Sequence, residues 1–155
     1  MAFITHEGAR LTSTDLLGRP FAVVFGYTHC PDVCPTSLLQ WSTILQRAGA
    51  RADTFKVLFV SVDGERDTPE VLRAYLAAFD SRIVALTGPA SAVAAAAAQF
   101  GAQITKVSGR DGGYTIDHSI RSYLVDHRQR LSGTLDLATE EAEQLNALAV
   151  LLAPP

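Results

Sequence analysis

Residues 21–27 form a continuous apolar run, Phe-Ala-Val-Val-Phe-Gly-Tyr, rich in β-branched and aromatic side chains. A run without polar alternation is typical of a strand that is buried on both faces. Comparable runs at 55–62, 83–86 and 120–125 predict three further strands, the last of which ends at Asp126. The apolar faces of these strands must be covered by other elements packed against both faces of the sheet.

Helical patterns, one of them rich in alanine, alternate with the strand runs. They cover residues 35–47, 68–79, 89–100 and the stretch from Thr139 to the C-terminal prolines. Such alternation predicts an α/β fold with a central mixed sheet, parallel pairs within it, and helices on both faces. The glycine-rich turn at 109–113 predicts a β-hairpin excursion near residues 103–117.

Length and composition limit the classes of protein that this chain can belong to. At 155 residues, without a repeat or a linker, it is expected to fold as a single domain over residues 1–155 and to be a monomer. A net charge of −3 argues against nucleic acid or an anionic membrane surface as partner. No apolar stretch reaches the length of a membrane span, and no signal peptide opens the chain, although an anchor could have been trimmed from it.

The two cysteines of the chain lie four residues apart, in Cys30-Pro31-Asp32-Val33-Cys34. They follow the first buried strand and precede a helix. We expect Pro35 at the first helical position, which makes Cys34 the N-cap residue. A helix N-terminus favours thiolate over thiol, so the pair can serve as metal ligands or as a nucleophile. Two inert, buried cysteines are the third interpretation.

A histidine could complete a metal site with the two cysteines. His118 lies just before the last core strand, where a loop can approach the cysteines, although a single histidine is more often a surface residue than a ligand. The other histidines are expected to have other roles. His6 and His127 should be solvated surface residues, and the His29 side chain should point away from Cys30.

At these positions the chain resembles the Sco/SenC family, thioredoxin-fold proteins that bind copper and help to assemble the binuclear copper site of cytochrome c oxidase. The resemblance runs in order from about residue 11 to 126. It is carried by Phe25-Gly26-Tyr27-Thr28-His29-Cys30-Pro31-Asp32-Val33-Cys34-Pro35, Val62-Asp63-Gly64-Glu65-Arg66-Asp67-Thr68-Pro69, Leu86-Thr87-Gly88, Asp117-His118-Ser119 and Tyr123-Leu124-Val125-Asp126.

The resemblance implies a copper metallochaperone with a thioredoxin-like fold. It implies that Cys30, Cys34 and His118 are the copper ligands and that Asp63 lies close behind them. Two thiolates and an imidazole suit Cu(I) and keep Cu(II) accessible, whereas a structural zinc site needs four protein ligands.

The expected partner is the copper-receiving domain of cytochrome c oxidase subunit II, with a copper donor or a thiol reductant as a further partner. The expected location is the periplasm, either free or anchored to the membrane. Three positions depart from the family pattern: Gly64 replaces a proline, while His127 and Gln129 replace the proline and glycine of a turn. These departures suggest a more mobile loop at Asp63 and an altered turn after Asp126.

A thiol–disulfide oxidoreductase is the main alternative, with Cys30 and Cys34 as its redox pair and a copper-receiving protein as its substrate. The chain is otherwise expected to be a carrier and not an enzyme. The CxxxC spacing and the absence of proline from residues 119–122 argue against simple thioredoxin activity. A peroxiredoxin-like peroxidase ranks lower, because Gly26-Tyr27-Thr28-His29 precedes the first cysteine in place of the expected proline and threonine.

Overall fold

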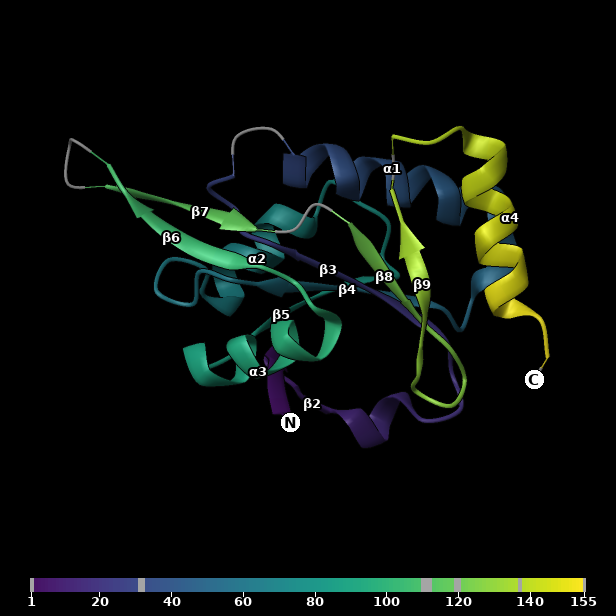
Figure 1. Ribbon diagram of the computed structural model, residues 1–155, viewed down its shortest axis with the longest axis horizontal. Helices are drawn as coiled ribbons and strands as arrows, with labels where there is room; N and C mark the ends of the chain where they lie inside the picture. Colours follow the sequence, from purple (N-terminus) through teal and green to yellow (C-terminus); the bar gives the residue numbers. More distant parts are fainter. Residues whose placement is uncertain (1, 31–32, 110–112, 119–120, 137, 155) are drawn as a thin grey trace.

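The computed structural model describes residues 2–30, 33–109, 113–118, 121–136 and 138–154 (Figure 1). Its strands are β1 (Ala2–Thr5), β2 (Arg10–Thr12), β3 (Phe21–Gly26), β4 (Lys56–Ser61), β5 (Ile83–Thr87), β6 (Ile104–Ser108), β7 (Tyr114–His118), β8 (Ser122–Val125) and β9 (Leu131–Leu135). Its α-helices are α1 (Val33–Ala48), α2 (Pro69–Leu76), α3 (Ala90–Phe100) and α4 (Glu141–Leu152). None of these helices is long and apolar enough to cross a membrane.

Seven of the described strands form a mixed sheet in the order β2-β1-β5-β4-β3-β8-β9. The central strands β3, β4 and β5 are parallel, whereas β1, β8 and β9 are antiparallel to their neighbours. The predicted mixed sheet with parallel pairs is therefore confirmed. The two N-terminal strands were not predicted, because runs of three or four residues carry almost no periodicity.

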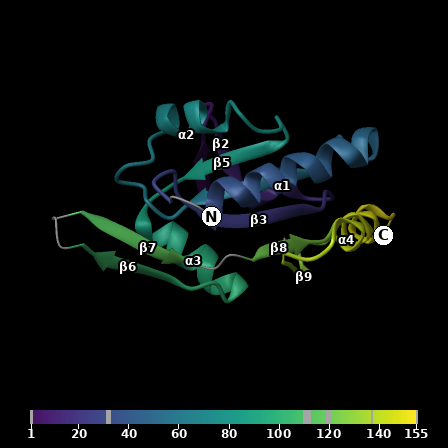
Figure 2. The ribbon, with the colours of Figure 1, turned by 90° about the horizontal axis from the view of Figure 1, so that it is seen from above.

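Alternation along β3 divides its side chains between two apolar cores. Ala22 and Val24 belong to a core that includes residues of α1, α2 and α4, whereas Phe21, Val23 and Phe25 pack in a second core with α3. Helices therefore cover both faces of the sheet, as the sequence predicted (Figure 2). Burial on both faces explains why the β3 run is continuously apolar.

The predicted hairpin near residues 103–117 is present as a separate two-stranded antiparallel sheet of β6 and β7. Its register pairs Ile104 with His118 and Ser108 with Tyr114. Figures 1 and 2 show the hairpin extending from the body of the molecule, with the end of β7 on the side where α1 begins. The hairpin thus carries His118 back toward the cysteine loop.

Two local predictions near the cysteines and histidines were wrong. Helix α1 begins at Val33, so Cys34 lies in its first turn and is not the N-cap residue. A proline is tolerated at Pro35 because N–H groups of the first turn have no intrahelical partner. His6 is not simply solvated: its Nδ1 accepts a hydrogen bond of 3.1 Å from the Ala85 N–H.

The departures at Gly64 and Gln129 have visible local consequences. Gln129 adopts a left-handed backbone with φ of 60°, a conformation that glycine takes without strain. Asp126 supports this turn by accepting hydrogen bonds from the N–H groups of Arg128 and Arg130. At Gly64, an added Cβ would lie 3.2 Å from the Gly88 carbonyl oxygen, so the chain makes a close backbone approach there.

An ion pair between Asp80 and Arg82 lies in the loop that connects α2 to β5. The Arg82 guanidinium donates to both carboxylate oxygens of Asp80, each at 2.9 Å, and to the Gly49 carbonyl at 3.0 Å. Both side chains are largely buried. The hydrogen bonds from Arg82 lower the pKa of Asp80 below its usual value.

Asp80→Asn is expected to lower the free energy of unfolding by about 1–3 kcal/mol at neutral pH, because Arg82 loses its buried partner. Because the pKa of the Asp80 carboxyl group is lower in the folded than in the unfolded protein, the ion pair stabilises the fold fully above the unfolded pKa of about 3.9. This contribution is lost as the pH falls through the pKa of Asp80 in the folded protein. Urea unfolding at neutral and acid pH should show the two proteins converging in acid. Asp53→Asn is the control, because exposed Asp53 lies 4.0 Å from Arg82 and should cost under about 0.5 kcal/mol. Equal losses in both variants would contradict this role.

Candidate metal centre

The cysteine loop connects the end of β3 to the start of α1. The Cys30 N–H donates a hydrogen bond of 3.2 Å to the Tyr27 carbonyl, which closes a tight turn before the first cysteine. Cys30 is half-buried and packs against the core beneath α1 and α2. Residues 31 and 32 and the Cys34 side chain lie outside the described part of the structure. The pairing of Cys30 with Cys34 therefore stays a prediction.

Asp67 anchors this loop from the segment that precedes α2. Its side chain is fully buried, and its carboxylate accepts hydrogen bonds from the Thr28 N–H at 3.1 Å and the Thr28 hydroxyl at 2.6 Å. The Ser61 hydroxyl donates to the same carboxylate at 2.8 Å. A buried polar group is costly unless it is hydrogen-bonded, and these three hydrogen bonds compensate the burial of the Asp67 side chain. Asp67 thus fixes the backbone two residues before Cys30.

His118 is the last residue of β7 and is half-buried. Its imidazole contacts the Tyr27 ring edge-to-face, with the ring centroids 5.8 Å apart and the planes at 84°. The Tyr27 hydroxyl also accepts a hydrogen bond of 3.1 Å from the Ile116 N–H, two residues earlier in β7. Cys30 and His118 therefore both contact Tyr27, one through its carbonyl and the other through its ring.

Asp63, which the resemblance places near the ligands, is buried between the end of β4 and the hairpin. The Tyr114 hydroxyl donates to its carboxylate at 2.6 Å, and Arg66 forms an ion pair with it. The hydrogen bond to Asp63, assisted by burial, raises the pKa of Tyr114 to about 12. Burial is the largest single effect on Arg66 and opposes its charge, but the hydrogen bond to Asp63 and the attraction of Asp63, Tyr114 and Tyr27 together outweigh it and raise the pKa of Arg66.

Arg66 also fastens the hairpin to the body of the protein. Its guanidinium carbon lies 3.8 Å from the centroid of the Tyr114 ring, and its Nη2 donates to the Tyr114 carbonyl at 3.4 Å. Asp63 and Arg66 therefore hold the beginning of β7, whereas Tyr27 holds the strand close to His118.

His29, Asp63 and Asp67 form a group of potential oxygen and nitrogen ligands within 4.8 Å of one another. The His29 ring is exposed, and its Nδ1 lies 3.3 Å from the Thr28 hydroxyl. Both carboxylates already accept strong hydrogen bonds, Asp63 from Arg66 and Tyr114, Asp67 from Thr28 and Ser61. We therefore interpret Asp67 as the polar support of the cysteine loop and Asp63 as that of the hairpin.

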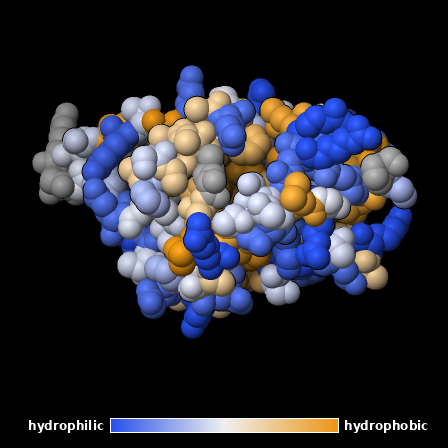
Figure 3. Space-filling view, turned by 90° about the horizontal axis from the view of Figure 1, so that it is seen from below, coloured by the Kyte–Doolittle hydropathy of each residue, from blue (hydrophilic) through white to orange (hydrophobic). Residues whose placement is uncertain are grey.

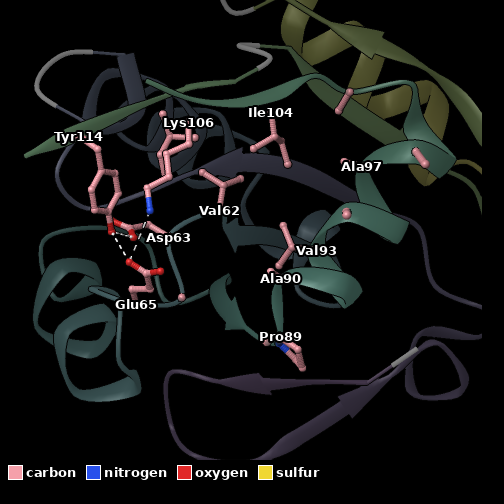
Figure 4. A pocket seen from close by; sticks show the side chains of 16 residues that line it. Val62, Asp63, Glu65, Pro89, Ala90, Val93, Ala97, Ile104, Lys106 and Tyr114 are labelled. Atoms are coloured by element: carbon pink, nitrogen blue, oxygen red, sulfur yellow. Dashed lines mark hydrogen bonds and ion pairs between the residues drawn. The ribbon is translucent and has the colours of Figure 1, made fainter. Parts of the chain in front are cut away.

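An open pocket of about 640 Å³ begins at Asp63 and runs between α3 and the hairpin. Its polar end contains Asp63, Glu65, Lys106 and Tyr114, and its floor is apolar, with residues including Val62, Val93, Ala97 and Ile104 (Figure 4). The space-filling view shows small apolar residues over α3, with hydrophilic side chains on the hairpin beside them (Figure 3). Strand β7 contributes Tyr114 and Ile116 to this pocket.

Side chains at alternate positions of β7 share one face, so Tyr114, Ile116 and His118 point to the same side of the hairpin. That face packs toward the cysteine loop, because Tyr114 reaches Asp63 and His118 reaches Tyr27. The chemistry of Cys30 and His118, a thiol sulfur and an imidazole nitrogen, suits a soft or borderline metal. The fold and these donors define an α/β protein with a cysteine loop at a strand-to-helix junction and a histidine on an added hairpin.

The comparison with protein families agrees with this class. The family model for SCO1/SenC matches residues 2–153. Protein SenC of Rhodobacter capsulatus is 32% identical over 139 residues, which cover 90% of this chain and 62% of that protein. The chain therefore belongs to the SCO1/SenC family, and the resemblance seen in the sequence is confirmed. It spans 37% to 61% of the length of the first curated relatives that it matches.

Solved structures show the same fold. Bradyrhizobium japonicum ScoI with copper bound matches with a TM-score of 0.90 and 37% identity, over 97% of this chain and 96% of that one. BsSco, a Sco family member with a disulfide switch, matches with a TM-score of 0.79 over 98% and 91% of the two chains. At 19% identity, the BsSco match supports the fold alone. The predicted fold class is confirmed by these matches.

Sequence reasoning assigned no role to Tyr27 or Asp67, although both lie within the matched motifs. Their roles depend on contacts with residues far along the chain: Tyr27 binds Ile116, and Asp67 binds Thr28. A buried aspartate between a strand and a helix N-cap could have been suspected, but its partner was not visible in the sequence.

Proposed function

We propose that this protein is a copper carrier that holds Cu(I) and Cu(II) through the thiolates of Cys30 and Cys34 and the imidazole of His118. The observation that carries the proposal is the meeting of the Cys30 turn and the His118 strand at Tyr27. The match to a copper-bound ScoI over nearly the whole chain supports it. The position of Cys34 in the first turn of α1 favours its thiolate.

The copper-receiving partner that we propose is the copper domain of cytochrome c oxidase subunit II. The membership of the chain in the SCO1/SenC family supports this, because the resemblance in its motifs implies a role in assembling the binuclear copper site of cytochrome c oxidase. We also propose a location facing the periplasm, which the similarity to a bacterial SenC supports.

A thiol–disulfide oxidoreductase is the second candidate. Cys30 and Cys34 can exchange between dithiol and disulfide with a partner, and the thioredoxin-like fold supports such chemistry. The disulfide switch described for BsSco belongs to that protein. The carrier and the oxidoreductase use the same cysteines. Only a residue that one of these functions needs and the other does not can distinguish between the two functions.

The reduced protein is expected to bind one Cu(I) per chain, and the oxidised protein none with comparable affinity, because a disulfide offers no thiolate. Anaerobic titration with a Cu(I) indicator of known affinity measures both forms. Re-reduction of the oxidised sample should restore the full stoichiometry, which controls for irreversible damage. Full copper loading of the disulfide form would exclude the proposed site.

A further inference from the structure

Tyr27 has two separate contacts with β7, and they involve different parts of its side chain. The phenol oxygen accepts the Ile116 N–H at 3.1 Å, and the ring packs edge-to-face on the His118 imidazole at 5.8 Å. The side chain is 3% exposed, so both contacts are shielded from water. A buried backbone N–H without a partner would be costly, which makes the Tyr27 hydroxyl important for docking β7.

The Ile116 N–H is the point at which β7 is held to the body of the protein near its end. Ile116 is paired with Lys106 of β6, but its N–H is directed to Tyr27 and away from the hairpin partner. Its side chain is buried and faces the pocket beside α3. Because His118 follows two residues later on the same face, a shift of β7 at Ile116 would move the imidazole as well.

The same tyrosine also shapes the cysteine loop. Its carbonyl accepts the Cys30 N–H at 3.2 Å, so the turn that presents Cys30 begins at Tyr27. The backbone of Tyr27 is thus tied to Cys30, and its side chain to β7 and His118. The Arg66 guanidinium lies 5.9 Å from the centroid of the Tyr27 ring, on the side of the second hairpin attachment at Tyr114.

We infer that Tyr27 is a positioning residue for the metal site: its hydroxyl sets the distance between His118 and the cysteine loop by docking β7 at the Ile116 N–H. This inference rests on the proposed function, because it assigns to Tyr27 the orientation of a proposed ligand. Cu(I) tolerates low coordination and can be held by two thiolates, whereas Cu(II) needs the imidazole. The hydroxyl therefore governs the affinity for Cu(II) much more than that for Cu(I).

Tyr27→Phe tests the inference, since phenylalanine keeps the ring and removes only the acceptor. In the copper-free protein, hydrogen exchange of the Ile116 amide should become about 5–10-fold faster, as expected when one net hydrogen bond is lost. Cu(II) affinity should fall about 10-fold, the lower limit for the loss of a group that orients a metal ligand. Cu(I) affinity should change less than about 3-fold, and the Cu(II) absorption spectrum should shift.

Tyr123→Phe is the matched control, because Tyr123 is a similarly buried tyrosine whose ring packs against Phe25 and Phe100 in the core with α3. It should leave the Ile116 exchange rate, the Cu(II) affinity and the spectrum unchanged. Unaltered exchange or unaltered Cu(II) affinity in Tyr27→Phe would overturn the inference, and so would an equal change in the control. A wild-type protein that binds no copper would instead refute the proposed function, whereas the exchange measurement on copper-free protein would still report on β7 docking.

Discussion

Serine in place of Cys30 is expected to lower the affinity for Cu(I) by more than about 100-fold, because even a group that only orients a metal ligand is worth about 10–100-fold. A serine hydroxyl remains protonated at neutral pH and is a hard oxygen donor, so it cannot replace a soft thiolate. Competition titration against a Cu(I) indicator of known affinity, under anaerobic conditions, measures the loss. A decrease of less than tenfold would show that Cys30 is not a ligand.

The fold should tolerate this substitution, which keeps the result interpretable. Cys30 is half-buried in a loop, and serine has almost the same shape, so the thermal midpoint should move by only a few degrees. Cys34→Ser is the companion variant and should lose Cu(I) affinity to a similar extent. The double variant should be little weaker than either single one, because two ligands of one ion act as a unit. Additive losses would indicate two independent sites.

The central part of the fold was predictable because its signals are local and strong. The continuous apolar run of β3 and the capped start of α2 at Thr68 are both present as expected: the Thr68 hydroxyl accepts the Val71 N–H at 3.2 Å. The hairpin was predictable from its turn residues. Strands β1 and β2 were not, because each is short and is stabilised by pairing with distant residues; Ile4, for example, pairs with Thr87.

The motifs of the candidate site could be recognised in the sequence, but the geometry around them could not. The motifs at Cys30 and His118 could be recognised from sequence, whereas their common neighbour Tyr27 required the three-dimensional fold. The same holds for Asp63, which was expected behind the ligands. Its partners Arg66 and Tyr114 come from the adjacent turn and from the hairpin, and only Arg66 is close in sequence.

The start of α1 shows where sequence rules conflict. The proline rule places Cys34 before the helix, but the helix begins at Val33 because a first-turn proline loses no hydrogen bond. Cys34 therefore lies among the free N–H groups of the first turn. Helix N-termini in general favour thiolate over thiol, in the first turn as well as at the N-cap, so the earlier start of α1 does not remove the prediction that Cys34 is a ligand.

His118→Ala is expected to abolish tight Cu(II) binding while Cu(I) affinity falls only in part, because two thiolates can still hold Cu(I). The disulfide exchange of Cys30 and Cys34 needs no imidazole, so the rate of dithiol reduction of a model disulfide should change only modestly. Transfer of copper to an apo copper domain should fail in this variant if the protein works as a carrier. Absorption spectra of the Cu(II) form, indicator titrations and a coupled thiol assay measure the three activities on one preparation.

His127→Ala is the matched control, since His127 lies in the turn between β8 and β9, directly after the pairing of Val125 with Phe21 at the start of β3, whereas the cysteine loop follows the end of β3. It should bind and transfer copper like the wild type. Loss of Cu(II) binding in His118→Ala alone, with thiol exchange preserved, supports the carrier over the oxidoreductase, because only the carrier uses the imidazole. Undiminished copper transfer together with a collapse of disulfide reduction would reverse that assignment and make His118 part of a redox enzyme.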